Sequence, residues 1–272
     1  MLVAGVFFSL MNVGVKYLDN IPAIQIVFFR SLVTLIISFV MIKRLKLSLW
    51  GNNKSVLFLR GLFGAIALSL YFYSLQTLPL ASAVTLMQLS PIFTAIFAIF
   101  ILHEKIKLPQ WVFFVVSFLG VAIIKGFDKN ISLLDFVIAI AAAAFSALAY
   151  NMVRKLKDTD HPLVVVFYFP LIALPIAGVA SMFVWVQPTF VELLILLGIG
   201  VCTQIAQVNM TKAMQMEELS KVSIVQYLTI IYAIAIGFVF YRESYTLYTL
   251  FGIAMVIGGV VANLWYSKRV KK

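Results

Sequence analysis

The chain has 272 residues, of which 63% are hydrophobic and only 11% are charged, and its mean hydropathy is +1.07. Soluble domains carry roughly 25% charged residues, so this composition excludes a soluble globular protein, and its hydrophobicity excludes a disordered one. The net charge of +11 does not indicate nucleic-acid binding, because the basic residues lie between apolar stretches, where they orient membrane helices. The chain is therefore expected to be a polytopic membrane protein.

Ten apolar segments follow one another along the chain, separated by short loops that contain Pro, Gly, Asn or Asp. A spanning helix takes about 20 apolar residues, so ten segments use almost the whole length and leave no room for a soluble domain. The predicted fold class is an all-α polytopic membrane protein with ten transmembrane helices. The segments run approximately over residues 2–17, 23–42, 55–75, 82–102, 109–126, 133–153, 162–185, 190–213, 220–241 and 246–266.

Lysine and arginine are distributed unevenly between the two sets of loops. If the first segment starts in the cytoplasm, the inner flanks hold 16 of the 21 Lys and Arg residues, Arg60 among them, and the outer flanks hold four. Arg30 is left inside the second segment. Cytoplasmic loops are enriched in Lys and Arg, so this bias predicts that both termini are cytoplasmic. We expect an integral protein of the plasma (inner) membrane, surrounded by lipid.

The two halves of the chain resemble each other. Residues 76–123 slide by 139 positions onto residues 215–262 without a gap. Chance agreement between two apolar sequences is the alternative, but it does not readily explain matches at Gln, Glu and Gly. Each half has five segments, and an odd number forces the second half to enter from the opposite side, which predicts two inverted five-helix repeats. The repeats are residues 1–130 and 131–272, which together form one transmembrane domain. Matched pairs are Gln76 with Gln215, Glu104 with Glu243 and Gly120 with Gly259.

Three motifs of the first half carry a resemblance to a known family. They are Leu89-Ser90-Pro91-Ile92-Phe93-Thr94, Leu102-His103-Glu104-Lys105-Ile106 and Phe118-Leu119-Gly120-Val121. In these motifs the chain resembles the EamA-type branch of the drug/metabolite transporter superfamily. The resemblance implies a transporter built from inverted repeats, but it is weak for the substrate, because the superfamily carries very different solutes. The second half has Thr229-Ile230 where the first has Ser90-Pro91, so a kinked helix is expected only in the first half.

Several segments carry their polar residues on one helix face, at spacings of three or four residues. In lipid such a stripe indicates either a wet cavity or hydrogen bonds that join helices. We favour helix-joining bonds for isolated Ser and Thr, and a cavity lining for Gln and Tyr. The fifth and tenth segments carry Gly instead and are expected to pack against their neighbours. The candidates for a substrate cavity are Asn12, Tyr71, Tyr73, Gln88, Tyr150, Gln204, Gln207, Gln226, Tyr227 and Tyr232.

Arg30 lies eight positions after Pro22, which places it about 12 Å into the second helix. Two interpretations stay open for this residue. It either reaches outward to an acidic side chain such as Asp19, or it faces the cavity and offers a bidentate fork to a substrate carboxylate.

Glu104 and Glu243 each stand at the end of a helix and are followed by a turn. Either residue could serve as a gate or a coupling site, or it could anchor a helix end to a neighbouring basic group, which we favour. Pro91 removes a backbone hydrogen bond inside the fourth segment and predicts a kink, which is either a hinge for transport or inert.

The chain lacks the residue patterns of membrane enzymes and pumps. Both histidines, His103 and His161, fall in loops, and Cys202 stands alone in its segment, so we expect no metal site. No Gly-rich phosphate-binding loop with a Lys is present, so an ATP-driven pump lacks its chemistry. We expect no enzymatic activity and no cofactor.

The primary hypothesis for function is a secondary carrier of a small neutral or zwitterionic organic metabolite that works by alternating access. Tyr and Gln side chains suit such a solute, because they supply stacking faces, donors and acceptors. Amino acids and S-adenosylmethionine-like compounds both fit, and S-adenosylmethionine is a substrate known within the branch that the chain resembles. The alternatives are a passive channel and a non-transporting membrane scaffold. The partners are a small-molecule substrate and lipid, with no nucleic acid; whether the chain forms a homo-oligomer is left open.

Overall fold

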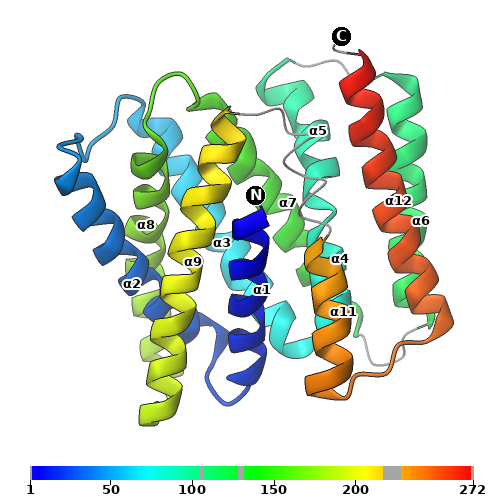
Figure 1. Cartoon of the computed structure of the whole chain (residues 1–272), viewed down its shortest axis with the longest axis horizontal. Coiled ribbons are helices and arrows are strands. Elements are labelled where there is room, and N and C mark those ends of the chain that lie inside the picture. Colours follow the sequence, from blue (N-terminus) through cyan, green and yellow to red (C-terminus); the bar gives the residue numbers. More distant parts are fainter. Residues whose placement is uncertain (1, 104–106, 128–131, 217–227, 271–272) are drawn as a thin grey trace.

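The computed structural model describes residues 2–103, 107–127, 132–216 and 228–270. Within these residues the chain is helical and forms no strand (Figure 1). The helices are α1 (Leu2–Tyr17), α2 (Ala23–Arg44), α3 (Lys54–Thr77), α4 (Leu80–Met87), α5 (Ser90–Ile101), α6 (Leu108–Phe127), α7 (Leu133–Lys155), α8 (Pro162–Met182), α9 (Phe190–Met216), α11 (Leu228–Tyr241) and α12 (Leu247–Val270).

Six helical segments of the described residues are long and apolar enough to cross a membrane. They cover residues 23–44, 54–77, 80–101, 133–155, 162–182 and 190–215, and four shorter apolar helices accompany them. The prediction of an all-α polytopic membrane protein is therefore confirmed for the described part of the chain. Each predicted apolar segment overlaps a described helix, although the segment predicted at 220–241 is described only from Leu228 onward.

The loop residues define where several helices begin. Pro22 and Pro79 precede α2 and α4, and their fixed φ suits a helix start while the missing N–H costs nothing there. The Ser132 hydroxyl accepts a hydrogen bond from the Asp135 N–H (3.0 Å) at the start of α7. At the start of α8 the His161 Nδ1 accepts from the Leu163 N–H (3.2 Å). These caps explain why the short punctuated loops separate the helices.

The segment predicted as one helix over 82–102 is divided in the structure. α4 ends at Met87 and α5 begins at Ser90, with a tight turn at Gln88, whose N–H donates to the Thr85 carbonyl (3.0 Å). Pro91 has no N–H and cannot bond to the Met87 carbonyl one turn earlier, so the continuous helix is interrupted there. The expected kink in the first half is thus a break between two helices.

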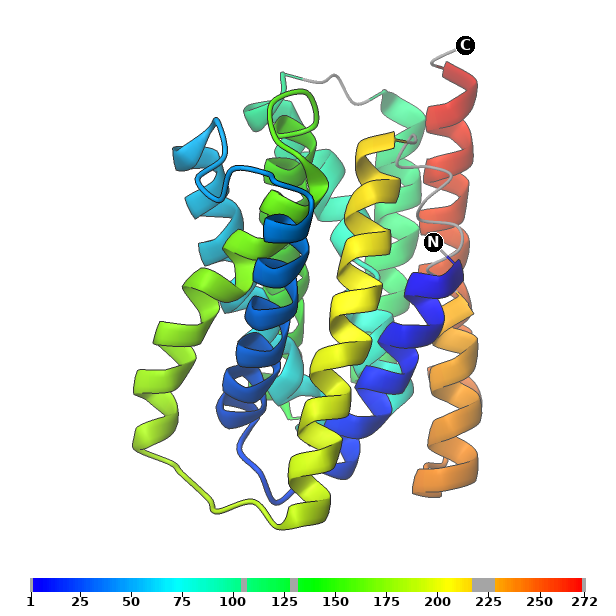
Figure 2. The ribbon, with the colours of Figure 1, turned by 60° about the vertical axis from the view of Figure 1, so that its left-hand side comes forward.

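The second half also contains helix-disturbing residues, which the sequence analysis overlooked. Pro170 and Pro175 both lie inside α8, where each removes a backbone hydrogen bond. Figure 2 shows α8 leaning away from α9 toward its lower end. The expectation that only the first half holds a kinked helix was therefore too narrow, because it compared only the positions equivalent to Ser90 and Pro91.

α6 and α12 pack along each other at one edge of the molecule (Figure 1). A Cβ at Gly120 would lie 2.6 Å from the Gly252 carbonyl oxygen, and a Cβ at Gly259 would lie 2.7 Å from the Phe113 oxygen. Only glycine permits this approach of the two backbones. The predicted packing role of the fifth and tenth segments is thus confirmed at these glycines, whereas Gly258 has no atom within 4 Å of a Cβ position.

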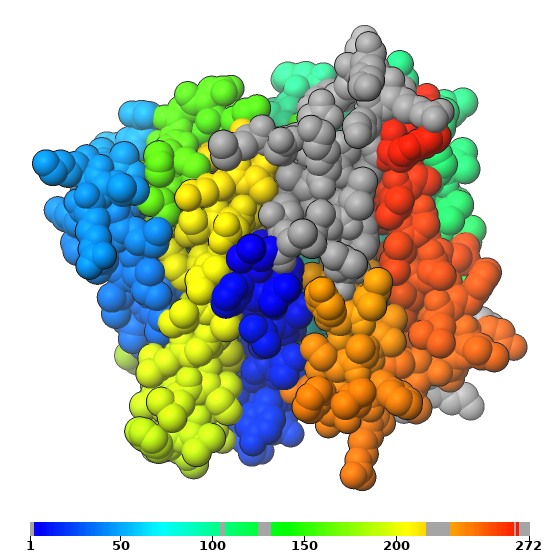
Figure 3. All heavy atoms as spheres, viewed as in Figure 1, coloured from blue at the N-terminus to red at the C-terminus, as the bar shows by residue number. Residues whose placement is uncertain are grey.

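The remaining helices form the body of the bundle. α1 packs on α9, α2 on α8, α3 on α7 and α8, α5 on α7, and α4 on α11. Figure 3 shows α1 on the surface in this view, between α9 and α11. In this arrangement helices of the two halves pack on one another, while α6 and α12 pack mainly on each other at one edge.

Candidate functional site

A cavity of about 120 Å³ lies inside the bundle. A single water needs roughly 10–15 Å³ of such space, so the cavity has room for several. Side chains of α1, α2, α3, α4, α5, α7, α8, α9 and α11 contribute to its wall, whereas α6 and α12 contribute none. The wall thus includes the segments with polar stripes and omits the two Gly-bearing ones, and it also includes α2 and α8, which had not been expected to line a cavity.

Six of the candidate residues line the cavity together. Gln88 stands in the turn between α4 and α5, and its Nε2 donates to the Thr229 hydroxyl of α11 (3.1 Å). The Gln207 Oε1 is buried and has no hydrogen-bond partner. The structure therefore brings polar groups from both halves of the chain to one space. The six residues are Asn12, Arg30, Tyr71, Gln88, Tyr150 and Gln207.

Other candidates lie elsewhere. Gln204 is 3% exposed but faces α2, where it exchanges hydrogen bonds with the Ser38 hydroxyl (2.9 and 3.1 Å). Tyr73 and Tyr232 are 37% and 38% exposed and do not line the cavity. Gln204 thus joins two helices in the way proposed above for Ser and Thr. Gln226 and Tyr227 lie outside the described residues.

Arg30 faces the cavity rather than an acidic residue near the surface. It is 1% exposed, and its Nε donates to the Thr203 hydroxyl of α9 (3.1 Å). Its guanidinium carbon lies 5.9 Å from the centre of the Phe72 ring and 4.8 Å from that of Phe169, which are cation–π distances. Among the described residues no acidic side chain pairs with Arg30, and its contacts fit the cavity-facing interpretation.

A second arginine in the cavity wall escaped the sequence analysis. Arg60 was counted with the inner flanks, but it lies six positions after Lys54, about 9 Å into α3, and is 2% exposed. Its Nε is buried without a hydrogen-bond partner. A signal was present in the sequence, because Arg60 stands beside Gly61 and one helical turn before Gly64, where small residues permit close packing.

The two guanidinium groups share one aromatic ring. The guanidinium carbon of Arg60 lies 4.9 Å from the centre of the Phe169 ring, so the carbons of the two arginines are less than about 10 Å apart. Gly64 makes room for this packing, since a Cβ there would contact Arg60 Nη1 and lie 2.9 Å from the Phe169 ring. Phe169 thus holds two positive charges at one wall of the cavity.

No acidic residue of the described ranges forms an ion pair with either arginine. The one ion pair among those residues is between the Lys16 Nζ and the Glu243 Oε1 (3.5 Å). Among the described residues, the cavity wall includes no Asp, Glu or His. The site is therefore a largely apolar cavity with a few polar groups and two buried positive charges, for which the described residues supply no carboxylate.

Besides its ion pair with Lys16, Glu243 accepts hydrogen bonds from two further groups at the end of the bundle. Both of its carboxylate oxygens accept a hydrogen bond from the Leu80 N–H at the start of α4 (2.9 Å each). The Tyr245 hydroxyl also donates to it (2.5 Å), and burial and this bond raise the pKa of Tyr245. A carboxylate at a helix N-terminus is a stabilising arrangement. These contacts agree with the favoured role of Glu243 as an anchor; its repeat mate Glu104 lies outside the described residues.

The described residues hold no group of three His, Cys, Asp or Glu side chains that could bind a metal ion. Asn, Gln, Tyr and Arg dominate the polar part of the cavity wall, and these side chains bind organic groups rather than metals.

Comparison with known proteins gives the arrangement a context. The model of the EamA-like transporter family matches residues 1–126 and 134–265. The pseudopaline exporter CntI of Pseudomonas aeruginosa is 31% identical over 261 residues, which cover 94% of this chain and 91% of that protein. Human solute carrier family 35 member G1 is 27% identical, with 98% and 79% covered.

Two further similarities concern a relative named as an uptake transporter and a solved structure. The S-adenosylmethionine uptake transporter of Rickettsia conorii is 26% identical, with 93% of this chain and 87% of that protein covered. A solved crystal structure superimposes with a TM-score of 0.74 at 15% sequence identity and covers 99% of this chain and 96% of its own. At that identity the likeness concerns the fold alone.

Proposed function

The chain belongs to the EamA-like transporter family, and from this premise we propose that it is a secondary carrier that moves a small organic metabolite by alternating access. It is a membrane transporter and not an enzyme, as its relatives are named transporters of metabolites. The observation that carries the proposal is the cavity, whose wall combines residues of both halves of the chain and holds several polar side chains among apolar ones.

The proposal includes two inverted five-helix repeats, residues 1–130 and 131–272. Reciprocal contacts between α6 and α12 support these repeats. Residue 252 follows residue 113 by 139 positions, and residue 259 follows residue 120 by the same number. Gly120 approaches the carbonyl of residue 252, and Gly259 approaches that of residue 113. Exchanging every residue for its repeat mate turns one contact into the other, as a pseudo-two-fold axis in the membrane plane requires.

A second reciprocal contact lies far from this helix pair. The Gln76 Nε2 donates to the Ile21 carbonyl (2.8 Å), and the Gln215 Nε2 donates to the Asp160 carbonyl (3.4 Å). Both donors and both acceptors are again separated by 139 positions. The matched glutamines of the sequence repeat thus make equivalent bonds, which supports extending the pseudo-symmetry across the bundle.

Alternating access requires one part of the bundle to move against the rest around a fixed site. We place the hinge at the break between α4 and α5, where Pro91 interrupts the helix and Gln88 reaches the cavity. A discontinuous helix beside a central site is frequent in transporters, because its freed backbone groups can line the cavity. A rotation at this point would move α4 relative to α5 without breaking a complete helix.

The amide and phenol groups of the wall suit a neutral or zwitterionic amphipathic solute, such as an amino acid or an S-adenosylmethionine-like compound. Gln88 and Gln207 supply donors and acceptors, and Tyr71 and Tyr150 supply stacking faces. The relatives named an exporter and an uptake transporter differ in direction and solute, so they support the transport of metabolites in general.

Counterflow in proteoliposomes tests the carrier. A carrier exchanges external labelled solute for internal unlabelled solute, whereas a passive channel shows no trans-stimulation and a scaffold moves nothing. Trans-stimulation of at least threefold by a bound metabolite would support the proposal. Equal fluxes with and without internal solute would favour the channel instead.

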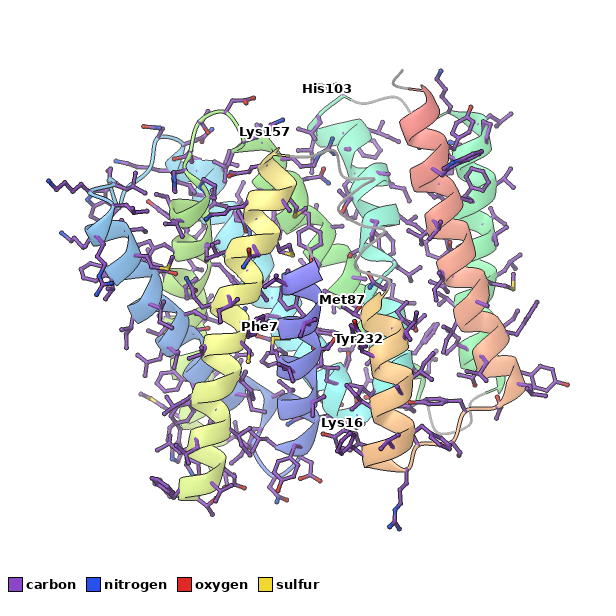
Figure 4. The ribbon with its side chains drawn as sticks, in the orientation of Figure 1. Phe7, Lys16, Met87, His103, Lys157 and Tyr232 are labelled. Atoms are coloured by element: carbon purple, nitrogen blue, oxygen red, sulfur yellow. The ribbon has the colours of Figure 1, made fainter. Side chains whose placement is uncertain are left out.

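We further propose that the protein lies in the plasma (inner) membrane with both termini cytoplasmic. The bias of 16 basic residues on the inner flanks to four on the outer ones supports this orientation. His103 and Lys157 lie at one end of the bundle and Lys16 at the other, as the alternation of loops requires (Figure 4). Reporter fusions at each terminus should report the cytoplasm, and an external location of either terminus would contradict the orientation and the even number of helices.

A further inference from the structure

We propose that the transported solute is an organic anion whose carboxylate is bound between Arg30 and Arg60. The inference rests on the carrier function proposed above, and within that carrier the two arginines favour a solute with a net negative charge over the neutral one considered there. It disfavours solutes with a net positive charge and requires at least one carboxylate on the solute.

A charged side chain buried in a membrane protein without a counter-charge is unfavourable, and such residues usually pair with one another or mark a substrate pathway. Arg30 and Arg60 are 1% and 2% exposed, and in the described ranges neither forms an ion pair. Both line the cavity. Because the described protein groups do not supply the counter-charge, an anion in the cavity would supply it.

The Nε of Arg30 is held by Thr203, and Phe169 packs on both guanidinium groups, so the two side chains are fixed in place. A guanidinium presents paired N–H groups that match the two oxygens of a carboxylate. The guanidinium carbons lie less than about 10 Å apart, which a single carboxylate or a short dicarboxylate can bridge.

The buried Oε1 of Gln207 has no hydrogen-bond donor, and Gln207 lies in the same wall as the arginines. A buried acceptor without a donor is unfavourable, and a donor on the solute would satisfy it. The cavity therefore favours an organic acid that also carries a hydroxyl or amino group over a simple inorganic anion.

The experiment uses the full-length protein, purified in detergent and reconstituted in proteoliposomes. Succinate, glutamate, alanine, lysine and sulfate serve as probes. Binding is measured from the rise in apparent melting temperature with probe concentration, because a ligand of the folded state stabilises it by mass action. Exchange is measured as counterflow of labelled succinate, glutamate, alanine and lysine.

The variants are Arg60→Gln, Arg60→Lys and the matched control Arg44→Gln. Arg44 lies at the exposed end of α2, so Arg44→Gln removes the same charge outside the cavity. We expect succinate and glutamate to bind and exchange, and lysine to do neither. Arg60→Gln should raise the dissociation constant for them at least thirtyfold, Arg60→Lys should have a smaller effect, and Arg44→Gln should match the wild type.

Three results would overturn the proposal. The first is the absence of any stabilisation by succinate and glutamate. The second is stabilisation by sulfate equal to theirs without carboxylate exchange, which would indicate an inorganic anion site. The third is exchange of alanine or lysine that Arg60→Gln leaves unchanged, which would keep the carrier and remove the anion site. Conversely, Arg60-dependent binding without exchange of any probe would keep the anion site and reject the carrier.

Discussion

Two charged regions of the molecule differ in whether their basic side chains are paired with a carboxylate. At one end of the bundle Lys16 and Glu243 form an ion pair, and their side chains are 16% and 12% exposed. Glu243 also accepts from the Leu80 N–H, and the Lys16 Nζ donates to the Leu78 carbonyl (2.6 Å). In the cavity, Arg30 and Arg60 are more deeply buried, and no described carboxylate pairs with them.

The Lys16–Glu243 pair therefore stabilises the folded protein, whereas we expect Arg30 and Arg60 to bind a ligand. A charge satisfied by carboxylates, carbonyls and helix ends contributes to stability, and its removal leaves its partner unpaired. A buried charge without a counter-ion costs stability in the free protein and is retained for what it binds. The same kind of substitution should therefore have opposite effects on stability in the two regions.

The largest effect is expected for Arg60→Met in the cavity. Transport of a carboxylate should fall at least about thirtyfold, since removing one side of a buried charge pair costs about 2–5 kcal/mol. The folded protein should become more stable without solute by about 1–3 kcal/mol, because an unpaired buried charge is replaced by an apolar side chain of similar length. Counterflow and the melting temperature of the empty carrier measure the two effects. A lower melting temperature would show that Arg60 is satisfied within the protein.

Glu243→Gln is expected to change the stability of the folded protein in the opposite direction. The substitution removes the counter-charge of Lys16 and weakens the bonds at the start of α4, so the protein should lose about 1.5–3 kcal/mol of stability. The melting temperature of the purified protein measures the loss, and Asp158→Asn serves as control, because Asp158 is exposed in a loop. A Glu243→Gln protein as stable as the control would remove the distinction between the two regions.

A smaller contrast separates two glutamines three positions apart in α9. Gln207→Ala should reduce transport about three- to tenfold with little change in stability, because Gln207 lines the cavity. Gln204→Ala should leave transport near normal and cost about 0.6–1.7 kcal/mol of stability, because it removes the interhelical bonds to Ser38. Transport rates normalised to folded protein distinguish the two, and the reverse pattern would contradict the assignment of the cavity.

The same pair of residues shows what the sequence could predict and where it stopped. Hydropathy located the apolar segments to within a few residues, because the bilayer fixes their length. The polar stripe predicted in residues 190–213 also faces the interior, since Gln204 is buried and Gln207 lines the cavity. Gln204 and Gln207, however, differ by only about 60° around the helix, so the sequence could not assign one to α2 and the other to the cavity.

Arg60 shows a second limit of sequence analysis. Basic residues near the end of an apolar segment usually orient the helix, so the charge count treated Arg60 as part of an inner flank. In the structure α3 begins at Lys54, and Phe169, from a helix about 100 residues later in the chain, packs against the Arg60 guanidinium. Arg60 and Phe169 meet only through the packing of α3 on α8, which a local pattern cannot reveal.

The smallest effect is expected from a proton gradient. Proton-driven carriers usually hold an ionisable group that changes protonation inside the membrane. In the described residues the cavity wall contains no Asp, Glu or His, and arginine does not titrate in the physiological range. Glu243 forms an ion pair with Lys16 and accepts hydrogen bonds from the Leu80 N–H and the Tyr245 hydroxyl. We therefore expect an imposed pH gradient at zero membrane potential to change the initial rate of counterflow less than about twofold. A solute that stays fully ionised across the pH range must be used, so that its own protonation does not alter the rate. A several-fold stimulation that disappears in Glu104→Gln or Glu243→Gln would contradict this prediction, and it would turn the residue concerned from an anchor into a coupling site.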